Sequence, residues 1–461
     1  MAIAVLDVGK SSIKVSVLSA AGQQLGSAEI VNRPTQGEIY LVPDTTLIWN
    51  FLIDTLRDSE HAADIHDIVV STHGSSGFLI NRDRSTTPLP DYDALLPDGI
   101  DDLYASSADS FEERGCGISL GAGHLAKQMV WISTLHTEIL DAAEKLLFGP
   151  QYWAWRLCGV PSMELTSLSA QSHLWSVHNG KFASIVERFG WSHLMSEIRQ
   201  AGDVLGTLLP ELARQTGLGS DTRIRCGVHD STANFYRFEA AGFQDFTLLS
   251  SGTWLVTLSD LPLTRTGSDH DVNSHVSAAN ARMWSVRAMA GREFDILSRR
   301  HRGEIDIDDV NRVIEDQILA IPSFVPRDGL VPGSAGKGRI LGNEPETEGG
   351  RAALALVYYA MLADLSLDFF EDRGPIIVDG NITAQPILGE ILSAIRTNRT
   401  VYFSESNKGT TFGAALLADI KTVSKPALAR QTPKAINIDA LQRYRLAWRS
   451  HINSNQQGTM S

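Results

Sequence analysis

The stretch Asp7-Val8-Gly9-Lys10-Ser11-Ser12 decides the fold, because it lies between two short strand patterns at the head of the chain. Residues 3–6 are apolar, and residues 13–17 alternate between apolar and polar side chains. This alternation predicts a strand, a tight polar turn and a second strand. Gly9 lets the backbone approach an anion closely, and the N–H groups of the turn can point at phosphate oxygens. An ordinary hairpin turn has the same composition, so both interpretations stay open at this point.

The second half of the chain repeats this strand-turn-strand pattern. Residues 247–250 predict a strand, Ser251-Gly252-Thr253 a small-residue turn and residues 254–258 another strand. A helix over about 350–370 then precedes a buried strand at 376–378. The sequence therefore predicts an α/β fold with a β-hairpin at the head of each half. Each turn alone suits a plain hairpin, whereas two such turns together suit the two sides of one polyphosphate.

Length and order along the chain predict two domains. A chain of 461 residues is too long for one compact core and suits two domains of roughly 200 residues. We expect an N-terminal domain over residues 1–240, a C-terminal domain over 241–430 and a tail segment over 431–461, whose polar last ten residues fray.

Composition excludes several classes of function. The formal net charge is −14 and no Lys/Arg-rich run is present, so nucleic acid is not an expected partner. The longest apolar stretch, residues 352–362, is too short to span a bilayer, and the N-terminus shows no leader pattern. Cys116, Cys158 and Cys226 match no metal or redox spacing. We expect a cytoplasmic enzyme with no membrane partner.

The octet Gly227-Val228-His229-Asp230-Ser231-Thr232-Ala233-Asn234 carries the most chemical information, because two titratable groups lie between a strand pattern and a predicted helix. Asp230 can be an N-cap whose carboxylate accepts backbone N–H groups. It can also be the base that accepts a hydroxyl proton while Mg²⁺ neutralises phosphates, as phosphoryl transfer requires. His229 can bind a sugar hydroxyl or be a structural histidine.

Two further segments carry weaker signals. Asp379-Gly380-Asn381 ends a predicted strand before a helix, which is where α/β proteins bind ligands, although such turns also occur without a ligand. The small residues of Lys408-Gly409-Thr410-Thr411-Phe412-Gly413-Ala414-Ala415 suit close helix packing, so we interpret this segment mainly as structural.

The order of these motifs resembles the FGGY carbohydrate kinases, which belong to the hexokinase and actin superfamily. The resemblance covers residues 1 to about 420 and rests on seven segments: Asp7–Lys14, Ser71-Thr72-His73-Gly74, Gln128-Met129-Val130-Trp131, Tyr152–Gly159, Gly227-Val228-His229-Asp230, Leu249–Trp254 and Gly409–Ala415. It implies two RNase H-like domains that close a catalytic cleft between them, with ATP and Mg²⁺ as cofactors, a small sugar as substrate and a homodimer as an expected assembly.

The resemblance also implies roles for individual residues. Asp230 is the expected catalytic base, with His73, Gly74 and His229 near the sugar. Asp7 is expected to hold Mg²⁺ together with Asp230. The residues expected to bind the nucleotide are Asp7, Lys10, Ser11, Lys14, Gly252, Thr253, Gly380 and Asn381.

Three positions depart from the family pattern. Lys10 replaces the usual threonine of the first phosphate loop, and Asp379-Gly380-Asn381 replaces the usual triple-glycine turn near adenosine. An aromatic-Asp-x-Arg signature that contacts sugar in many members is represented only by Pro90-Asp91-Tyr92-Asp93-Ala94, without the arginine.

The resemblance implies transfer of the γ-phosphoryl group of ATP to a ketose, with the Ser-Ser-Gly-Thr-Trp turn at 250–254 favouring a deoxyketohexose such as L-rhamnulose or L-fuculose. Xylulose, ribulose, a tetrulose and a polyol stay open as acceptors. A non-catalytic sugar-binding regulatory protein is an alternative of another class, and an ATP-driven chaperone-like switch would need a peptide-binding appendix that the chain lacks.

Overall fold

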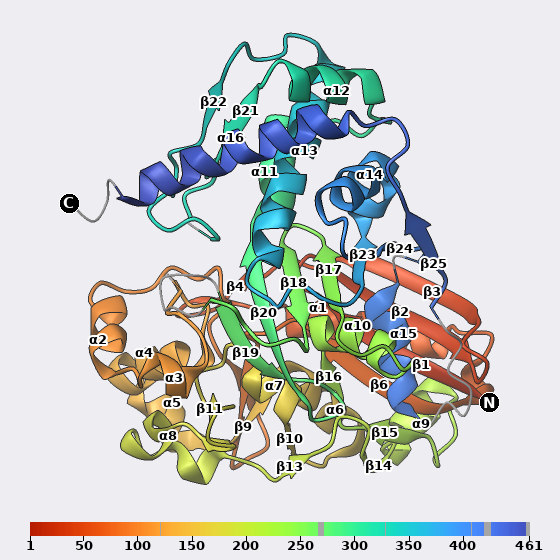
Figure 1. Cartoon of the computed structure of the whole chain (residues 1–461). Helices are drawn as coiled ribbons and strands as arrows, with labels where there is room; N and C mark the ends of the chain where they lie inside the picture. Colours follow the sequence, from red (N-terminus) through yellow and green to blue (C-terminus); the bar gives the residue numbers. More distant parts are fainter. Residues whose placement is uncertain (120, 266–271, 328, 407, 419–425, 458–461) are drawn as a thin grey trace. The chain divides into compact units, whose positions relative to one another are not determined.

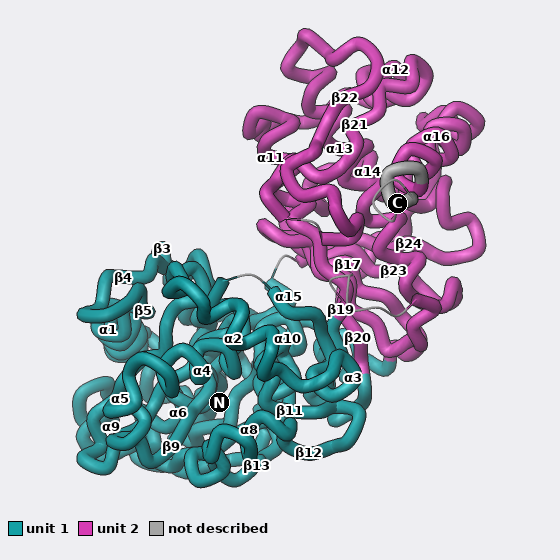
Figure 2. Tube along the Cα trace, turned by 90° about the vertical axis from the view of Figure 1, so that its left-hand side faces the viewer, with its two compact units in different colours: residues 1–242, 273–282, 408–425 teal, residues 243–272, 283–407, 426–461 magenta. Residues whose placement is uncertain are grey.

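The computed structural model describes residues 1–119, 121–265, 272–327, 329–406, 408–418 and 426–457, and it divides the chain into two compact units (Figure 2). Unit 1 contains residues 1–242, 273–282 and 408–425, and unit 2 contains residues 243–272, 283–407 and 426–461. The first change of unit falls between Gly242 and Phe243. Neither unit is one continuous stretch, unlike the domains expected from the sequence.

A seven-stranded mixed sheet forms the centre of unit 1 (Figure 1). Its strands run in the order β14-β15-β6-β1-β2-β3, and β16 also pairs with β6. The bounds are β1 Ala2–Val8, β2 Ser12–Ser19, β3 Gln24–Val31, β6 Ile65–Thr72, β14 Val204–Thr207, β15 Arg223–Arg225 and β16 Val228–His229. Strands β1, β2 and β3 form an antiparallel meander, whereas β6 and β15 add in parallel, so the hairpin predicted at the head of the chain is confirmed.

Helices cover both faces of this sheet. Helices α1 (Thr45–Arg57), α6 (Gly149–Cys158) and α9 (Pro210–Thr216) share a core with Leu6 and Val8, while α10 (Asp230–Glu239) and α15 (Gly409–Ala415) pack with Ile3 and Val5. Successive side chains of a strand point to opposite faces, so Asp7 lies on the face of Ile3 and Val5. Helix α10, which begins at Asp230, covers that same face.

An insertion of unit 1 builds a separate core. It comprises β4 Thr35–Gln36, β5 Leu41–Val42, β7 Gly77–Asn81, β8 Thr86–Pro88, α2 Ile100–Ser107, α3 Phe111–Arg114, α4 Leu125–Leu135, α5 Thr137–Ala142, β9 Ala143–Phe148, β10 Met163–Glu164, α7 Leu165–Ser169, β11 Trp175–Ser176, β12 Lys181–Phe182, α8 Ser184–Arg188 and β13 Ile198–Arg199. Strands β8, β7 and β9 pair in that order.

A second seven-stranded sheet has the order β19-β20-β18-β17-β23-β24-β25 (Figure 1), and its strands β20 to β25 belong to unit 2 apart from Arg282. The bounds are β17 Thr247–Ser251, β18 Leu255–Ser259, β19 Val272–Val276, β20 Arg282–Ala288, β23 Ile376–Gly380, β24 Val401–Ser404 and β25 Leu428–Gln431. Strands β20, β18 and β17 are antiparallel, and β23 and β24 add in parallel. This order, β20-β18-β17-β23-β24, repeats β3-β2-β1-β6-β15 of unit 1, so the predicted topological duplication and the α/β class are confirmed.

Helix α13 (Glu348–Leu367) forms the centre of the unit 2 core. It packs with α11 (Ala290–Leu297), α12 (Ile307–Glu315) and α14 (Pro386–Ile395), and β21 (Leu319–Ile321) pairs with β22 (Arg339–Leu341) beside it. Among the described residues, α13 alone has the length and mean hydropathy of a membrane span, and 94% of its most apolar window is buried inside the protein. It therefore has the burial of a core helix.

The segment expected as a tail contains helix α16 (Ile438–Gln457). Its Leu441, Tyr444 and Trp448 are buried in the unit 2 core because they recur at helical spacing. Arg445 Nε also donates to the buried Asp364 of α13 at 2.7 Å. This apolar stripe and ion pair hold α16 against the unit 2 core.

Candidate active site

The first predicted phosphate turn links β1 to β2, and Asn32 holds its backbone. The Asn32 side-chain amide donates to the Gly9 carbonyl at 2.7 Å, and the Asn32 backbone N–H donates to the Ser11 carbonyl at 3.0 Å. Ser11 is exposed at the tip of the turn. Asn32 is a residue that the sequence analysis missed, because no local pattern connects it to a turn more than 20 residues earlier.

Asp7 and Lys14 are register partners across the β1–β2 hairpin. Burial and the nearby carboxylate of Asp230 raise the pKa of Asp7 to about 7, and the charge of Lys14 opposes this shift. The two carboxylates predicted to serve the metal therefore lie close enough to interact electrostatically within unit 1. Because the two negative charges of Asp7 and Asp230 repel each other, a bound cation would stabilise them.

Asp230 is the first residue of α10, and the N-cap is His229, which makes no side-chain capping hydrogen bond. The Asp230 Oδ1 atom accepts the N–H of Ser231 at 2.5 Å and lies 3.4 Å from His229 Nε2. Its side chain is 27% exposed. The geometry thus differs from the N-cap alternative, because Asp230 lies inside the helix and keeps a partly exposed carboxylate.

His229 contacts this carboxylate, and His73 lies near enough to interact with its charge. A Cβ atom on Gly74 would lie 3.1 Å from His229 Nε2, so the absence of a side chain at Gly74 leaves room for this ring. Burial lowers the pKa of His73, and its Nδ1 atom lies 2.6 Å from the Gly74 carbonyl oxygen. A carbonyl can only accept, so Nδ1 carries the proton and Nε2 is an acceptor in the neutral ring. The structure therefore brings His73, Gly74, His229, Asp230 and Asp7 together in unit 1.

A buried network beneath His229 was also missed by the sequence analysis. The Thr166 hydroxyl accepts the backbone N–H of His229 at 2.9 Å and donates to Glu164 Oε2 at 2.6 Å. Glu164 also accepts the N–H groups of Thr166 and Ser167, while its burial raises its pKa to about 7. This network fixes the backbone that leads into Asp230.

Helix α15 packs closely against the start of α10. A Cβ atom on Gly413 of α15 would lie 1.7 Å from the Ala233 carbonyl oxygen, so only glycine fits at this position. The Thr410 hydroxyl donates to the Asp230 carbonyl at 3.5 Å. These contacts confirm the structural interpretation of the segment that contains Gly413.

The contacts of Lys10 differ from those of the other residues predicted to bind phosphate. Its ammonium group donates to Asp91 and lies 2.9 Å from Asp93 Oδ2. It also lies 4.2 Å from the centre of the Tyr92 ring. The structure thus connects Lys10 with the segment at 90–94 that the resemblance associates with sugar binding.

In unit 2, the end of β17 and the turn after it contact the start of helix α11 and the end of β23. A Cβ atom on Gly291 would lie 2.0 Å from the Gly252 carbonyl oxygen, and the Arg292 N–H donates to the Thr253 carbonyl at 3.1 Å. Gly380 has φ +94°, and a Cβ atom there would lie 2.1 Å from the Ser251 carbonyl oxygen. Glycine is therefore required at both contacts, and Gly291 is a residue that the sequence analysis missed.

These turns border a cavity of about 820 Å³ within unit 2. Gly252, Thr253 and Asn381 line it and are exposed, whereas Tyr359 is a buried lining residue. A cavity of this size is within the range for a small-molecule or cofactor site. The cavity lining thus includes three of the four unit 2 residues predicted to bind the nucleotide, and the fourth, Gly380, pairs with the lining residue Ser251 across β17 and β23.

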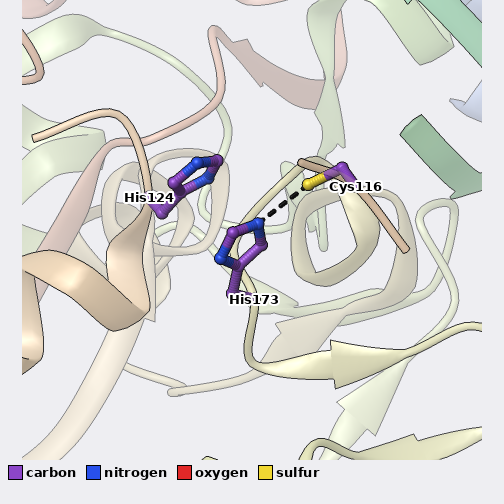
Figure 3. Close-up of side chains that lie close together, drawn as sticks. All are labelled: Cys116, His124 and His173. Atoms are coloured by element: carbon purple, nitrogen blue, oxygen red, sulfur yellow. Dashed lines mark hydrogen bonds between the residues drawn. The ribbon is translucent and has the colours of Figure 1, made fainter. Parts of the chain in front are cut away.

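Two groups of side chains among the described residues carry donor atoms that a metal ion accepts. The first is the carboxylate pair of Asp7 and Asp230, whose hard oxygen donors fit Mg²⁺. The second, within the described part of the chain, is a buried group formed by Cys116, His124 and His173 (Figure 3).

The geometry of this second group does not suit a metal. The His124 and His173 rings are stacked with centroids 3.7 Å apart and an interplanar angle of 18°. An ion must lie in the plane of each ring that binds it, and two nearly parallel planes do not meet near the rings. His124 also has both nitrogens engaged, with Ser119 N–H and the Gln171 carbonyl at 2.8 Å each. We interpret the Cys116 to His173 contact of 2.9 Å as part of a buried structural network.

The raised pKa of Asp7 predicts a dependence of stability on pH. A carboxyl group whose pKa is higher in the folded state stabilises the fold at low pH and loses this contribution as pH rises through about 7. Without added metal, Asp7→Asn is therefore expected to be more stable than the wild type at pH 8, by on the order of 1–2 kcal/mol, and to lose this advantage toward pH 5. Thermal unfolding from pH 5 to 8 measures this difference, with the exposed Asp141→Asn as control; parallel curves for Asp7→Asn and wild type would contradict it.

Family models match both parts of the chain. Residues 2–235 match the model described as the FGGY family of carbohydrate kinases, N-terminal domain, and residues 243–427 match the model described as carbohydrate kinase FGGY, C-terminal domain.

Two curated relatives are similar over part of their length. An L-fuculokinase from Salmonella typhi is 30% identical over 133 residues, which cover 28% of this chain and 28% of that protein. A rhamnulokinase from Bacteroides thetaiotaomicron is 26% identical over 217 residues, which cover 46% of this chain and 44% of that protein. The chain thus matches less than half of the length of either relative.

Solved structures are similar over the whole chain. A carbohydrate kinase from Novosphingobium aromaticivorans has a TM-score of 0.86 at 28% identity and covers 97% of this chain and 100% of its own. A xylulose kinase from Lactobacillus acidophilus has a TM-score of 0.81 at 15% identity and covers 100% of both chains, which shows the fold alone. These likenesses confirm the predicted architecture of two actin- and hexokinase-type α/β domains.

Proposed function

Because the chain belongs to the FGGY family of carbohydrate kinases, we propose that it transfers the γ-phosphoryl group of ATP to a hydroxyl group of a small ketose. The observation that carries this proposal is the partly exposed carboxylate of Asp230. It is the first residue of a helix, lies 3.4 Å from His229 Nε2 and raises the pKa of the neighbouring Asp7. A carboxylate in this setting can accept a hydroxyl proton.

In the proposed reaction, Asp230 takes the proton of the acceptor hydroxyl as its oxygen bonds to the γ-phosphorus. The bond between the γ-phosphorus and the bridging oxygen breaks, and ADP leaves with the electron pair of that bond. The Nε2 atom of the neutral His73 ring is an acceptor that can orient a second sugar hydroxyl. Gly74 and His229 complete the sugar side of the site.

Nucleotide binding is proposed for the turns of both units. In unit 1, the exposed Ser11 and the cation of Lys14 suit phosphate oxygens. In unit 2, the cavity lined by Gly252, Thr253 and Asn381 suits the rest of the nucleotide, with Gly380 as the strand partner of the lining residue Ser251.

Asp7 and Asp230 would hold Mg²⁺, which fits because their carboxylates interact and the pKa of Asp7 is raised to about 7. The ion, when bound, neutralises charge on the phosphates. Lys14 supplies a further positive charge on the same hairpin as Asp7.

For the acceptor we propose a deoxyketohexose such as L-rhamnulose or L-fuculose. Support comes from the partial likeness to proteins named rhamnulokinase and L-fuculokinase. Xylulose, ribulose, a tetrulose and a polyol are the alternatives. The alternative of a sugar-binding regulatory protein is less well supported, because Asp230 and both phosphate turns are retained. Three free, buried cysteines suit the reducing cytoplasm, where we propose that the enzyme works.

A coupled ADP-release assay with purified protein, Mg-ATP and a panel of ketoses and polyols tests the proposal. We expect turnover that depends on one of the ketoses and exceeds the sugar-independent rate. Thermal stabilisation by a sugar without any turnover would instead favour the regulatory protein.

A further inference from the structure

We propose that Lys10 is a positioning residue for the acceptor sugar rather than a ligand of the ATP phosphates. This inference rests on the proposed kinase function and concerns the segment Asp91-Tyr92-Asp93, which we call the acceptor turn. The Lys10 ammonium donates to Asp91, lies 2.9 Å from Asp93 Oδ2 and lies 4.2 Å from the centre of the Tyr92 ring. All three residues of the acceptor turn therefore contact one cation.

Breaking the contact between Lys10 and Asp91 would cost free energy of folding. The Asp91 side chain is 5% exposed, so a carboxylate there needs a cation or hydrogen-bond donors nearby. Asp91 Oδ1 also accepts the Asp93 N–H at 2.9 Å, and the Asp91 N–H donates to the Leu41 carbonyl at 2.8 Å. If Lys10 turned toward a phosphate, it would leave this buried carboxylate without its cation.

The acceptor turn also contacts His73, a histidine near the proposed base. The edge of one ring meets the face of the other between His73 and Tyr92, with centroids 6.0 Å apart. The pKa of His73 responds to the charges of Asp230, Lys10 and Asp91, so all three lie near this ring. A small cavity of about 10 Å³ is lined by Lys10, His73 and Asp91 among others. Movement of the acceptor turn would therefore move the ring that we propose binds the sugar.

The phosphate turn does not need the Lys10 side chain for its own shape. Asn32 holds both carbonyl groups, those of Gly9 and Ser11, from outside the turn. Lys14, the other cation of the hairpin, lies opposite Asp7 and 3.9 Å from the half-exposed Glu29, which is a looser pairing than that of Lys10. The two lysines thus have different roles: Lys14 binds the nucleotide and Lys10 positions the acceptor.

The sequence of the acceptor turn agrees with this division. Pro90-Asp91-Tyr92-Asp93-Ala94 contains two carboxylates and no basic residue. The cation that balances them comes from Lys10, about 80 residues earlier in the chain, and the fold brings the two together.

Lys10→Met is the decisive variant. We expect the KM for the ketose that the wild type phosphorylates to rise about 10- to 100-fold, the range that follows misplacement of a positioning group. The Kd for ADP, measured by calorimetric titration without sugar, is expected to change less than about twofold. Lys10→Arg keeps the charge and is expected to recover most of the acceptor affinity. Lys181→Met, on an exposed strand, is the matched control for loss of one lysine.

A tenfold or larger loss of ADP affinity in Lys10→Met would overturn the inference, and so would an unchanged acceptor KM. If the single variant unfolds because Asp91 is left unpaired, Lys10→Met/Asp91→Asn removes both charges and is tested by the same two measurements. If the wild type phosphorylates no acceptor, the kinase proposal fails by itself. The ADP titration of the variant then still decides whether Lys10 binds phosphate.

Discussion

Asp230→Asn is expected to lower kcat for sugar phosphorylation by about 10²- to 10⁴-fold, the usual contribution of a general base. The asparagine keeps an oxygen for the Ser231 N–H but cannot take the proton of the acceptor hydroxyl. ADP release with the best ketose measures the loss. Thermal stabilisation by ATP is expected to survive, because the turns and the cavity that we propose for the nucleotide are unchanged.

The exposed Asp141 of α5 offers a matched control, since Asp141→Asn makes the same chemical change outside every segment proposed here for binding. It is expected to keep wild-type turnover. Unchanged turnover in Asp230→Asn would remove this carboxylate from the mechanism and, with it, the observation on which the proposed function depends.

The parts of the fold that could be predicted are those written in local patterns. Alternating side chains and the small residues around Gly9 predict the first hairpin, and the same signals around Gly252 predict the second. Both are present, and the sheet order repeats between the units. Candidate residues such as Asp7 and Asp230 follow from these turns and from the strand-to-helix junction at 227–230.

Two regions of the fold differ from what the periodicity and composition of the sequence predict. Residues 125–147 have the pattern of one helix, but Ala143–Phe148 pairs as β9 with β7, because pairing with a buried strand outweighs local helix preference. Residues 84–115 are rich in Asp, Pro and Ser and so predict an irregular insertion, yet the region contains α2, where Ile100 and Tyr104 are buried one turn apart. Both differences depend on tertiary contacts that a single sequence does not state.

The unpredicted parts of the candidate site are contacts between distant segments. Asn32 and Thr166 contact the backbone of the turn and of His229, and neither lies in a motif of its own. The pairing of Lys10 with Asp91 joins residues that the resemblance assigns to different ligands. The residue types in a motif indicate the chemistry of a site. The distant residues that orient those side chains are known only from the folded structure.

Gly291→Ala is expected to reduce ATP and ADP affinity by about 100-fold while sugar-induced thermal stabilisation persists. A Cβ atom at this position would lie 2.0 Å from the Gly252 carbonyl oxygen and 3.1 Å from that of Thr253, so the turn must move. The Arg292 N–H that bonds the Thr253 carbonyl would move with it. A displacement of about an ångström in a positioning turn is enough for a loss of this size.

The comparison variant for Gly291→Ala is Gly26→Ala on β3, where a new Cβ atom would meet nothing within 4 Å. It makes the same change in composition and is expected to leave ADP affinity unaltered. Calorimetric titration of ADP and thermal shifts with the ketose separate the two proposed sites, since the residues proposed for sugar all belong to unit 1 and Gly291 belongs to unit 2. Wild-type ADP affinity in Gly291→Ala would show that the turn at Gly252 does not bind the nucleotide, and the cavity beside it would then need another ligand.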